Sequence, residues 1–187
     1  MVLAGRAPSP DPALSFVQPF PIWALTPEAF EIFVGDFLTQ LYPNAKVHPI
    51  GSKGHKQDGT DVEVIFPDGS NHSFQCKRHN VFGPDKVAKA VLAHTWPATQ
   101  KFIALSRPAS PQARLEIKKS PDWDIWDVED ISRKIRGLSK EAQQRLVDTF
   151  FRGQRLALLG EPEPGPWQTA EEFFAPFNGR GEFRRSE

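Results

Sequence analysis

Three polar side chains, Asp61, Gln75 and Lys77, fall in a segment that otherwise alternates like the two strands of a β-hairpin. An aspartate carboxylate and a glutamine carbonyl are hard oxygen ligands suited to Mg²⁺ or Mn²⁺, and the backbone carbonyl of Cys76 can add another. A lysine beside such an ion can orient a water molecule or stabilise negative charge on a phosphate. These residue types together supply what hydrolysis of a phosphodiester requires.

The turn between the two strands predicts how these residues are placed. The sequence FPDGS at 66–70 matches a three-residue hairpin loop, with a type I turn followed by a glycine in the left-handed conformation. If the first and last residues of this loop pair, Asp61 lies across from Gln75 on one face of the hairpin. Lys77 shares that face, whereas Cys76 points to the other.

Spacing alone leaves a second interpretation open, because polar side chains on one face of an antiparallel hairpin are also typical of a solvated surface. Zinc chemistry is less well supported. Zinc ligands could be proposed from Cys76 with His72, His79 or His55, but the sequence contains no second cysteine. The apolar neighbours expected for Cys76 also argue against a nucleophilic thiol.

The rest of the chain predicts the elements that position these residues. Thr26, followed by a proline and a glutamate, is typical of a helix start, and helical spacing of apolar residues continues until Pro43. A strand is expected at 46–50, before the hairpin. Further periodicity predicts helices at 84–94 and 111–119, strands at 101–106 and 122–127, and two helices within 128–151. This order indicates an α/β fold with a mixed central sheet flanked by helices.

We expect three parts in the chain. Residues 1–22 form a proline-rich N-terminal arm, 23–126 the α/β domain, and 127–187 a helical C-terminal extension that docks on the domain or on a partner. Within the arm and just after it, Phe16, Phe20 and Trp23 are candidates for packing onto the domain. A short aromatic helix is expected at 169–177.

The composition is that of an ordinary globular protein of 187 residues, with 39% hydrophobic and 25% charged residues. The 23 basic residues balance 23 acidic ones, so any surface for nucleic acid must be local. A single cysteine excludes an intramolecular disulfide and fits a reducing compartment, which makes the cytoplasm the expected location. No apolar run approaches the roughly 18 to 20 residues that span a bilayer, so no membrane association is expected.

Three motifs resemble those of the Mrr-type branch of the PD-(D/E)xK restriction-endonuclease-like superfamily, in its QxK variant. They are Phe30-Glu31 on the first helix, the turn Asp58-Gly59-Thr60-Asp61, and the strand Gln75-Cys76-Lys77-Arg78. They occur in the matching order over roughly residues 26–119. The resemblance implies a restriction-endonuclease-like fold and a Mg²⁺- or Mn²⁺-dependent endodeoxyribonuclease.

The same resemblance implies roles for individual residues. Asp61 would be the principal metal ligand, Gln75 would take the position of a second acid, and Lys77 would be the catalytic lysine. Glu31 would approach the metal from the first helix. Because Gln75 carries no charge, Glu31 or a DNA phosphate would have to supply further negative ligands.

Positive or potentially positive side chains gather near one end of the hairpin: Lys53, His55 and Lys56 precede it, and Arg78 and His79 follow it. We expect them to contact DNA phosphates rather than bases. Residues 120–187 contain no visible recognition helix, and the resemblance implies that specificity or activation comes from another domain or subunit. A homodimer, a protein partner or an effector assembly in restriction or anti-phage defence is therefore expected. The alternative is a catalytically degenerate nuclease-fold module that binds nucleic acid or a protein.

Overall fold

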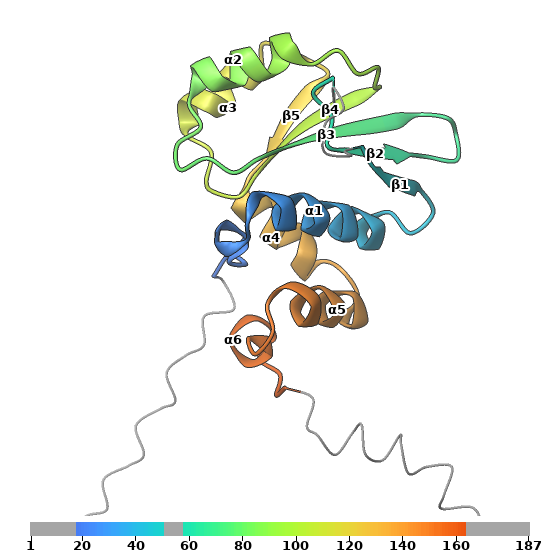
Figure 1. The fold of residues 1–187 in the computed structure, drawn as a ribbon, viewed down its shortest axis with the longest axis vertical. Coiled ribbons are helices and arrows are strands. Elements are labelled where there is room, and N and C mark those ends of the chain that lie inside the picture. The colour runs from blue at the N-terminus through green and yellow to red at the C-terminus, as the bar shows by residue number, and fades with distance from the viewer. Residues whose placement is uncertain (1–17, 51–57, 164–187) are drawn as a thin grey trace, which may run out of the picture.

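The computed structural model describes residues 18–50 and 58–163, which form a five-stranded sheet with helices on both faces (Figure 1). The strand order is β1-β2-β3-β4-β5; β1, β2 and β3 pair antiparallel, and β3, β4 and β5 pair parallel. The elements in chain order are η1 (Ile22–Ala24), α1 (Pro27–Leu41), β1 (Lys46–Pro49), β2 (Val62–Ile65), β3 (Asn71–Lys77), α2 (Pro84–Ala93), β4 (Gln100–Leu105), α3 (Pro111–Ile117), β5 (Trp123–Trp126), α4 (Val128–Arg136), α5 (Lys140–Phe150) and α6 (Arg155–Leu159). The predicted mixed α/β fold is confirmed. None of the helices in these ranges has the length and apolar character needed to cross a membrane.

The β2–β3 hairpin has the predicted register. Glu63 pairs with Ser73, and the N–H of Phe66 donates to the carbonyl of Ser70 over 2.9 Å. Gly69 adopts φ 85°, a left-handed conformation that strains any residue with a Cβ. The loop sequence therefore determines which residues of the two strands face each other.

Helix α1 begins with the predicted cap, since Thr26 Oγ1 accepts the N–H of Ala29 at 3.1 Å. Its inward face is aromatic, and Phe30, Phe33 and Phe37 are almost fully buried. Burial of each of these rings contributes about 1.5–3 kcal/mol. This packing fixes the position of α1 against the sheet. It therefore also fixes the position of the polar residues that flank the apolar stripe of the helix.

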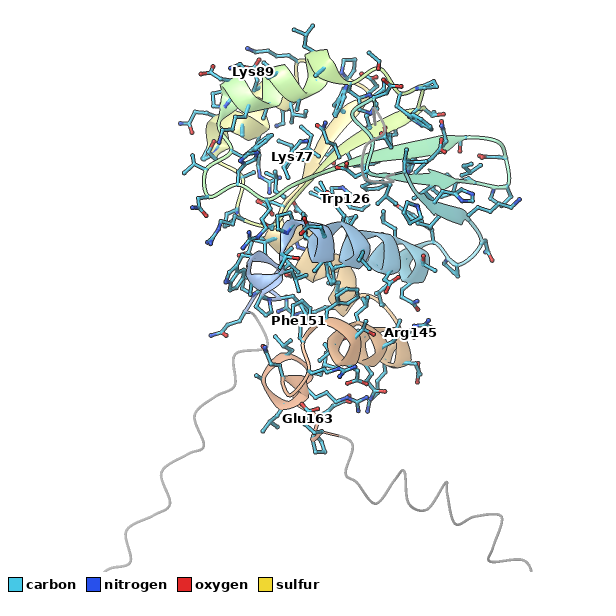
Figure 2. All side chains as sticks on the ribbon, viewed as in Figure 1. Lys77, Lys89, Trp126, Arg145, Phe151 and Glu163 are labelled. Carbon is cyan, nitrogen blue, oxygen red and sulfur yellow. The ribbon has the colours of Figure 1, made fainter. Side chains whose placement is uncertain are left out.

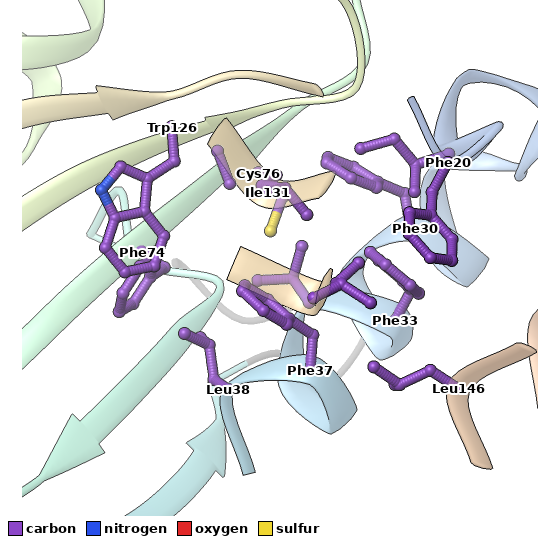
Figure 3. Close-up of a cluster of buried hydrophobic side chains, with 14 of the residues drawn as sticks. Phe20, Phe30, Phe33, Phe37, Leu38, Phe74, Cys76, Trp126, Ile131 and Leu146 are labelled. Atoms are coloured by element: carbon purple, nitrogen blue, oxygen red, sulfur yellow. The ribbon is translucent and has the colours of Figure 1, made fainter. Parts of the chain in front are cut away.

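The sheet separates two hydrophobic cores. On one face α1 and α4 cover a large core that includes Phe74 and Cys76 of β3. Trp126 lies between the sheet and α1, with its ring 6.5 Å from that of Phe37 (Figure 2). Figure 3 shows this core in close-up, with the Cys76 sulfur among apolar side chains. On the other face α2 and α3 cover a smaller core that includes Ile103.

Helices α4 and α5 join the larger core. They contribute Ile131, Ile135, Leu146 and Val147, all of which are almost fully buried against α1 or the sheet. Helix α6 follows, an element that the sequence did not predict. The helix expected at 169–177 lies outside the described residues, and a boundary between residues 126 and 127 stays a prediction.

The segment before α1 also packs on this core. Phe20 is buried and its N–H donates to Ser132 Oγ at 2.9 Å. Trp23 is half-buried against the same cluster. The packing expected for these two aromatic residues is seen, while Phe16 lies outside the described residues.

Candidate functional site

A tight turn precedes Asp61. Asp58 and Gly59 both have left-handed backbone conformations, with φ of 43° and 87°. The carbonyl of Asp58 accepts the N–H groups of Thr95 and Trp96 at 2.9 and 3.2 Å. These two residues belong to the loop that joins α2 to β4. These hydrogen bonds therefore anchor the turn to the loop that follows α2.

Asp61 leaves the hairpin ladder just after this turn. Its N–H donates to the carbonyl of Phe74 at 2.9 Å, and its Oδ2 accepts the N–H of Cys76 at 2.6 Å. In the continued register that N–H would bond the carbonyl of Thr60. The expected pairing of Asp61 across from Gln75 is thus not seen, because the carboxylate itself replaces a ladder carbonyl and β2 begins one residue later.

Gln75 lies on the face of β3 that α2 covers, and only 6% of it is exposed. Its Oε1 has no hydrogen-bond partner among the described residues. Leaving a polar group unsatisfied in this way costs about 1–3 kcal/mol, which a bound ligand would offset. Gln75 therefore does not lie on a solvated surface, which was the alternative that the spacing left open.

A buried polar cluster lies farther along the same face of β3. Ser73 Oγ is 2.7 Å from His94 Nε2, and Thr60 Oγ1 lies 2.9 Å from Ser73 Oγ and 3.2 Å from the same ring nitrogen. Burial, reinforced by the nearby ammonium of Lys101, lowers the pKa of His94 and favours the neutral ring. The cluster joins the C-terminal end of α2 to the turn before Asp61. The sequence did not predict it, because its members are distant along the chain.

Glu31 reaches Asp61 from α1, and the two carboxylates line a cavity of about 280 Å³ between α1 and β1. Burial, with the Asp61 carboxylate as a smaller cause, raises the pKa of Glu31, while Lys77 opposes the rise. Burial also raises the pKa of Asp61, against the Cys76 N–H and Lys77. Figure 2 shows Lys77 between α2 and α1. The structure therefore brings Glu31, Asp61 and Lys77 within electrostatic reach of one another.

These groups offer a small set of oxygen ligands for a metal ion. Asp61 supplies a carboxylate oriented by the main chain, Gln75 an unpartnered amide oxygen, and Glu31 a second carboxylate nearby. Across 18–50 and 58–163, no three His, Cys, Asp or Glu side chains form a metal-binding group. The set suits a hard ion that keeps several waters or takes phosphate oxygens as ligands, as Mg²⁺ does.

Cys76 does not add a soft ligand to this set. Its side chain points into the core on the opposite face of the sheet, as predicted. Burial raises the pKa of its thiol well above the usual value, and the carboxylates of Asp61 and Glu31 add to the rise. The thiol therefore stays protonated and unreactive at neutral pH.

No protein-family model matches this sequence, and no curated protein matches it. Among solved structures, the chain is similar to the MspJI restriction endonuclease in complex with a 27-mer oligonucleotide. The TM-score is 0.45 at 14% identity, over 76% of this chain and 35% of that one. The chain thus spans about a third of the length of that protein.

The structure describes two of the five residues expected to contact phosphate, Arg78 and His79, and both are exposed. The Arg78 guanidinium donates to the carbonyl of Trp23 at 3.3 Å. Lys53, His55 and Lys56 lie outside the described residues. Their part in DNA binding stays a prediction.

A basic surface lies beside Lys77, of which the sequence predicted His79 but not the lysines of α2. A hollow of about 430 Å³ between the end of β3 and α2 is lined by Gln75, Lys77, His79, Lys86 and Lys89, together with Phe82 and two alanines. The available signal was the placement of lysines 86 and 89 three residues apart on one helix, which puts them on the same face.

Proposed function

We propose that this protein is a metal-dependent endonuclease that hydrolyses phosphodiester bonds in DNA. One observation carries the proposal: the buried, unpartnered Oε1 of Gln75 lies on the same strand end as Lys77, where the main chain also holds the Asp61 carboxylate. The order of the three sequence motifs supports it independently. Asp61, Gln75, Lys77 and Glu31 are the proposed site residues.

Asp61, Gln75 and Glu31 would hold the Mg²⁺ or Mn²⁺ ion. When bound, such an ion polarises a phosphoryl oxygen and lowers the pKa of a coordinated water. The Cys76 N–H fixes the orientation of the Asp61 carboxylate before any ligand arrives. The raised pKa values of Asp61 and Glu31 reflect burial, which also strengthens their attraction for a cation.

Lys77 would act on the substrate. Its ammonium has three donors and no acceptor, so it can hold a water molecule or a non-bridging phosphate oxygen but cannot bind the metal. As water attacks phosphorus, negative charge grows on those oxygens, and a positioned ammonium stabilises it. The neighbouring carboxylates, Asp61 and Glu31, attract the ammonium toward the site.

We further propose a role in restriction or anti-phage defence, carried out as a homodimer or together with a protein partner. Within the described ranges, helices α4 and α5 use their apolar faces to pack on the α1-side core. They do not form a separate module that could read a DNA sequence. Target choice or activation would then come from a second copy or another protein.

The proposal is tested by incubating the native protein with supercoiled plasmid in Mg²⁺, in Mn²⁺ or in a chelator. We expect nicked and linear products with either metal and intact plasmid with the chelator. Intact plasmid in all three, with salt-sensitive DNA binding retained, would instead indicate the catalytically degenerate binding module. Equal cutting in all three would exclude a metal-dependent site.

Gln75→Glu is expected to bind Mn²⁺ at least about tenfold more tightly than the native protein. It adds a negative charge at the position of the unpartnered oxygen, and tenfold corresponds to about 1.4 kcal/mol. Isothermal titration calorimetry measures the difference, with Gln112→Glu at an exposed position of α3 as the control for net charge. Unchanged affinity in Gln75→Glu would mean that Gln75 is not a ligand.

A further inference from the structure

We propose that the hollow between β3 and α2 holds the phosphodiester backbone next to the scissile bond, and that Lys86 and Lys89 each contact a phosphate there. This inference rests on the nuclease function proposed above and deepens it by specifying the side from which the DNA strand reaches Lys77. The two lysines belong to none of the motifs found in the sequence.

The hollow is continuous with the proposed site. Gln75 and Lys77 form one of its walls, and α2 forms the other with Lys86 and Lys89. Ala90 and Ala93 lie on the same wall, so short side chains leave room beside the lysines. A strand whose scissile phosphate met Lys77 would therefore have an open path along α2.

Three lysines bring positive charge to the hollow, and the Asp61 and Glu31 carboxylates act on Lys77 from a distance without pairing with it. Lys77, Lys86 and Lys89 form no ion pair with any described carboxylate. Lys86 donates to the carbonyl of Val81 at 2.8 Å. Burial lowers the pKa of His79, and the ammonium groups of Lys86 and Lys77 lower it further. Crowded cations of this kind favour a polyanionic ligand.

The opposite side of the site has the opposite charge. Within 18–50 and 58–163, the charged residues that line the cavity between α1 and β1 are all acidic: Glu31, Asp36 and Asp61. A phosphate chain would be repelled there and attracted to the α2 side. This difference in charge between the described linings favours approach from the α2 side.

The spacing of the two lysines fits neighbouring phosphates. Side chains three residues apart on a helix have Cβ atoms about 5–6 Å apart, and successive phosphates of one strand wind around the duplex, so they lie farther apart than their axial spacing of about 3.4 Å. Long flexible side chains bridge the difference. The ligand is therefore the sugar-phosphate backbone, contacted without regard to base sequence.

The test measures affinity for a fluorescent duplex of mixed sequence, without metal, as salt is raised between about 50 and 200 mM. The variants are the native protein, Lys86→Ala/Lys89→Ala, and Arg145→Ala/Arg152→Ala. The arginine pair removes the same charge from exposed positions in and just after α5; Figure 2 shows Arg145 on α5 and Lys89 on α2. Both lysines are exposed, and alanine favours helix, so the lysine variant should fold.

We expect the lysine pair to reduce the slope of log affinity against log salt by about two, and the arginine pair to leave it unchanged. Equal slopes for native protein and lysine variant, an equal loss in the arginine variant, or no DNA affinity in the native protein would overturn the inference. Because this assay contains no metal, its outcome is separate from cleavage. A slope change in a protein that never cuts would support the backbone contact and refute the nuclease.

Discussion

Replacing Lys77 with alanine is expected to slow plasmid cleavage by roughly 10²- to 10⁴-fold, the usual range for losing a positioned proton-transfer group or charge stabiliser. The change removes the cation next to Asp61 and Glu31. Initial rates with saturating Mg²⁺ and excess plasmid measure the effect. Duplex affinity should fall far less, since only one phosphate contact is lost.

Lys118→Ala is the matched control for this substitution, because Lys118 is exposed just after α3 and belongs to neither hollow at the site. It should cut plasmid at the native rate. If Lys77→Ala cut as fast as Lys118→Ala, Lys77 would have no part in the reaction and the site would have to be sought elsewhere.

Gly59→Ala is expected to lower the free energy of unfolding and to abolish most cleavage. Gly59 has φ 87°, and a Cβ there would lie 2.9 Å from the Cα of His94. That atom is backbone, so relief requires the turn and the end of α2 to move apart. The turn leads directly into Asp61, and a misplacement of about 1 Å can cost roughly 100-fold in rate. Urea denaturation and plasmid cleavage measure the two effects.

Gly69→Ala is the control that distinguishes the steric clash expected at position 59 from the strain of a left-handed backbone. Gly69 has nearly the same φ, 85°, but a Cβ there would meet no atom within 4 Å. It should lose about 1–2 kcal/mol of stability from the left-handed conformation alone and keep its cleavage rate. Similar stability and cleavage in both variants would show that contact between the turn and His94 does not position Asp61.

Local sequence predicted the parts of this fold that depend on local chemistry. The loop before Ser70 set the register of the hairpin, and Thr26 with the proline after it set the start of α1. The alternation of β3 placed Cys76 in the core and Gln75 on the opposite face. In each case a few consecutive residues determine the outcome, so the pattern could be read without tertiary contacts.

Long-range contacts determine the rest, and the sequence did not reveal them. Whether Gln75 met solvent or protein depended on α2 packing over its face of the sheet. The Asp61 carboxylate took the N–H of Cys76, which hairpin geometry alone assigns to a carbonyl. His94 lies 21 residues after Ser73 in the sequence, and no periodic pattern marks such a contact.

The most direct test of a metal-dependent site at Asp61 compares plasmid cleavage in Mg²⁺ by the native protein and by Asp61→Asn, purified identically. Asparagine keeps the shape of the side chain and an oxygen to accept the Cys76 N–H, while removing the charge that would hold the metal. We expect the native protein to nick and linearise the plasmid and Asp61→Asn to leave it supercoiled. Equal cutting by both proteins would contradict a metal-dependent site at Asp61.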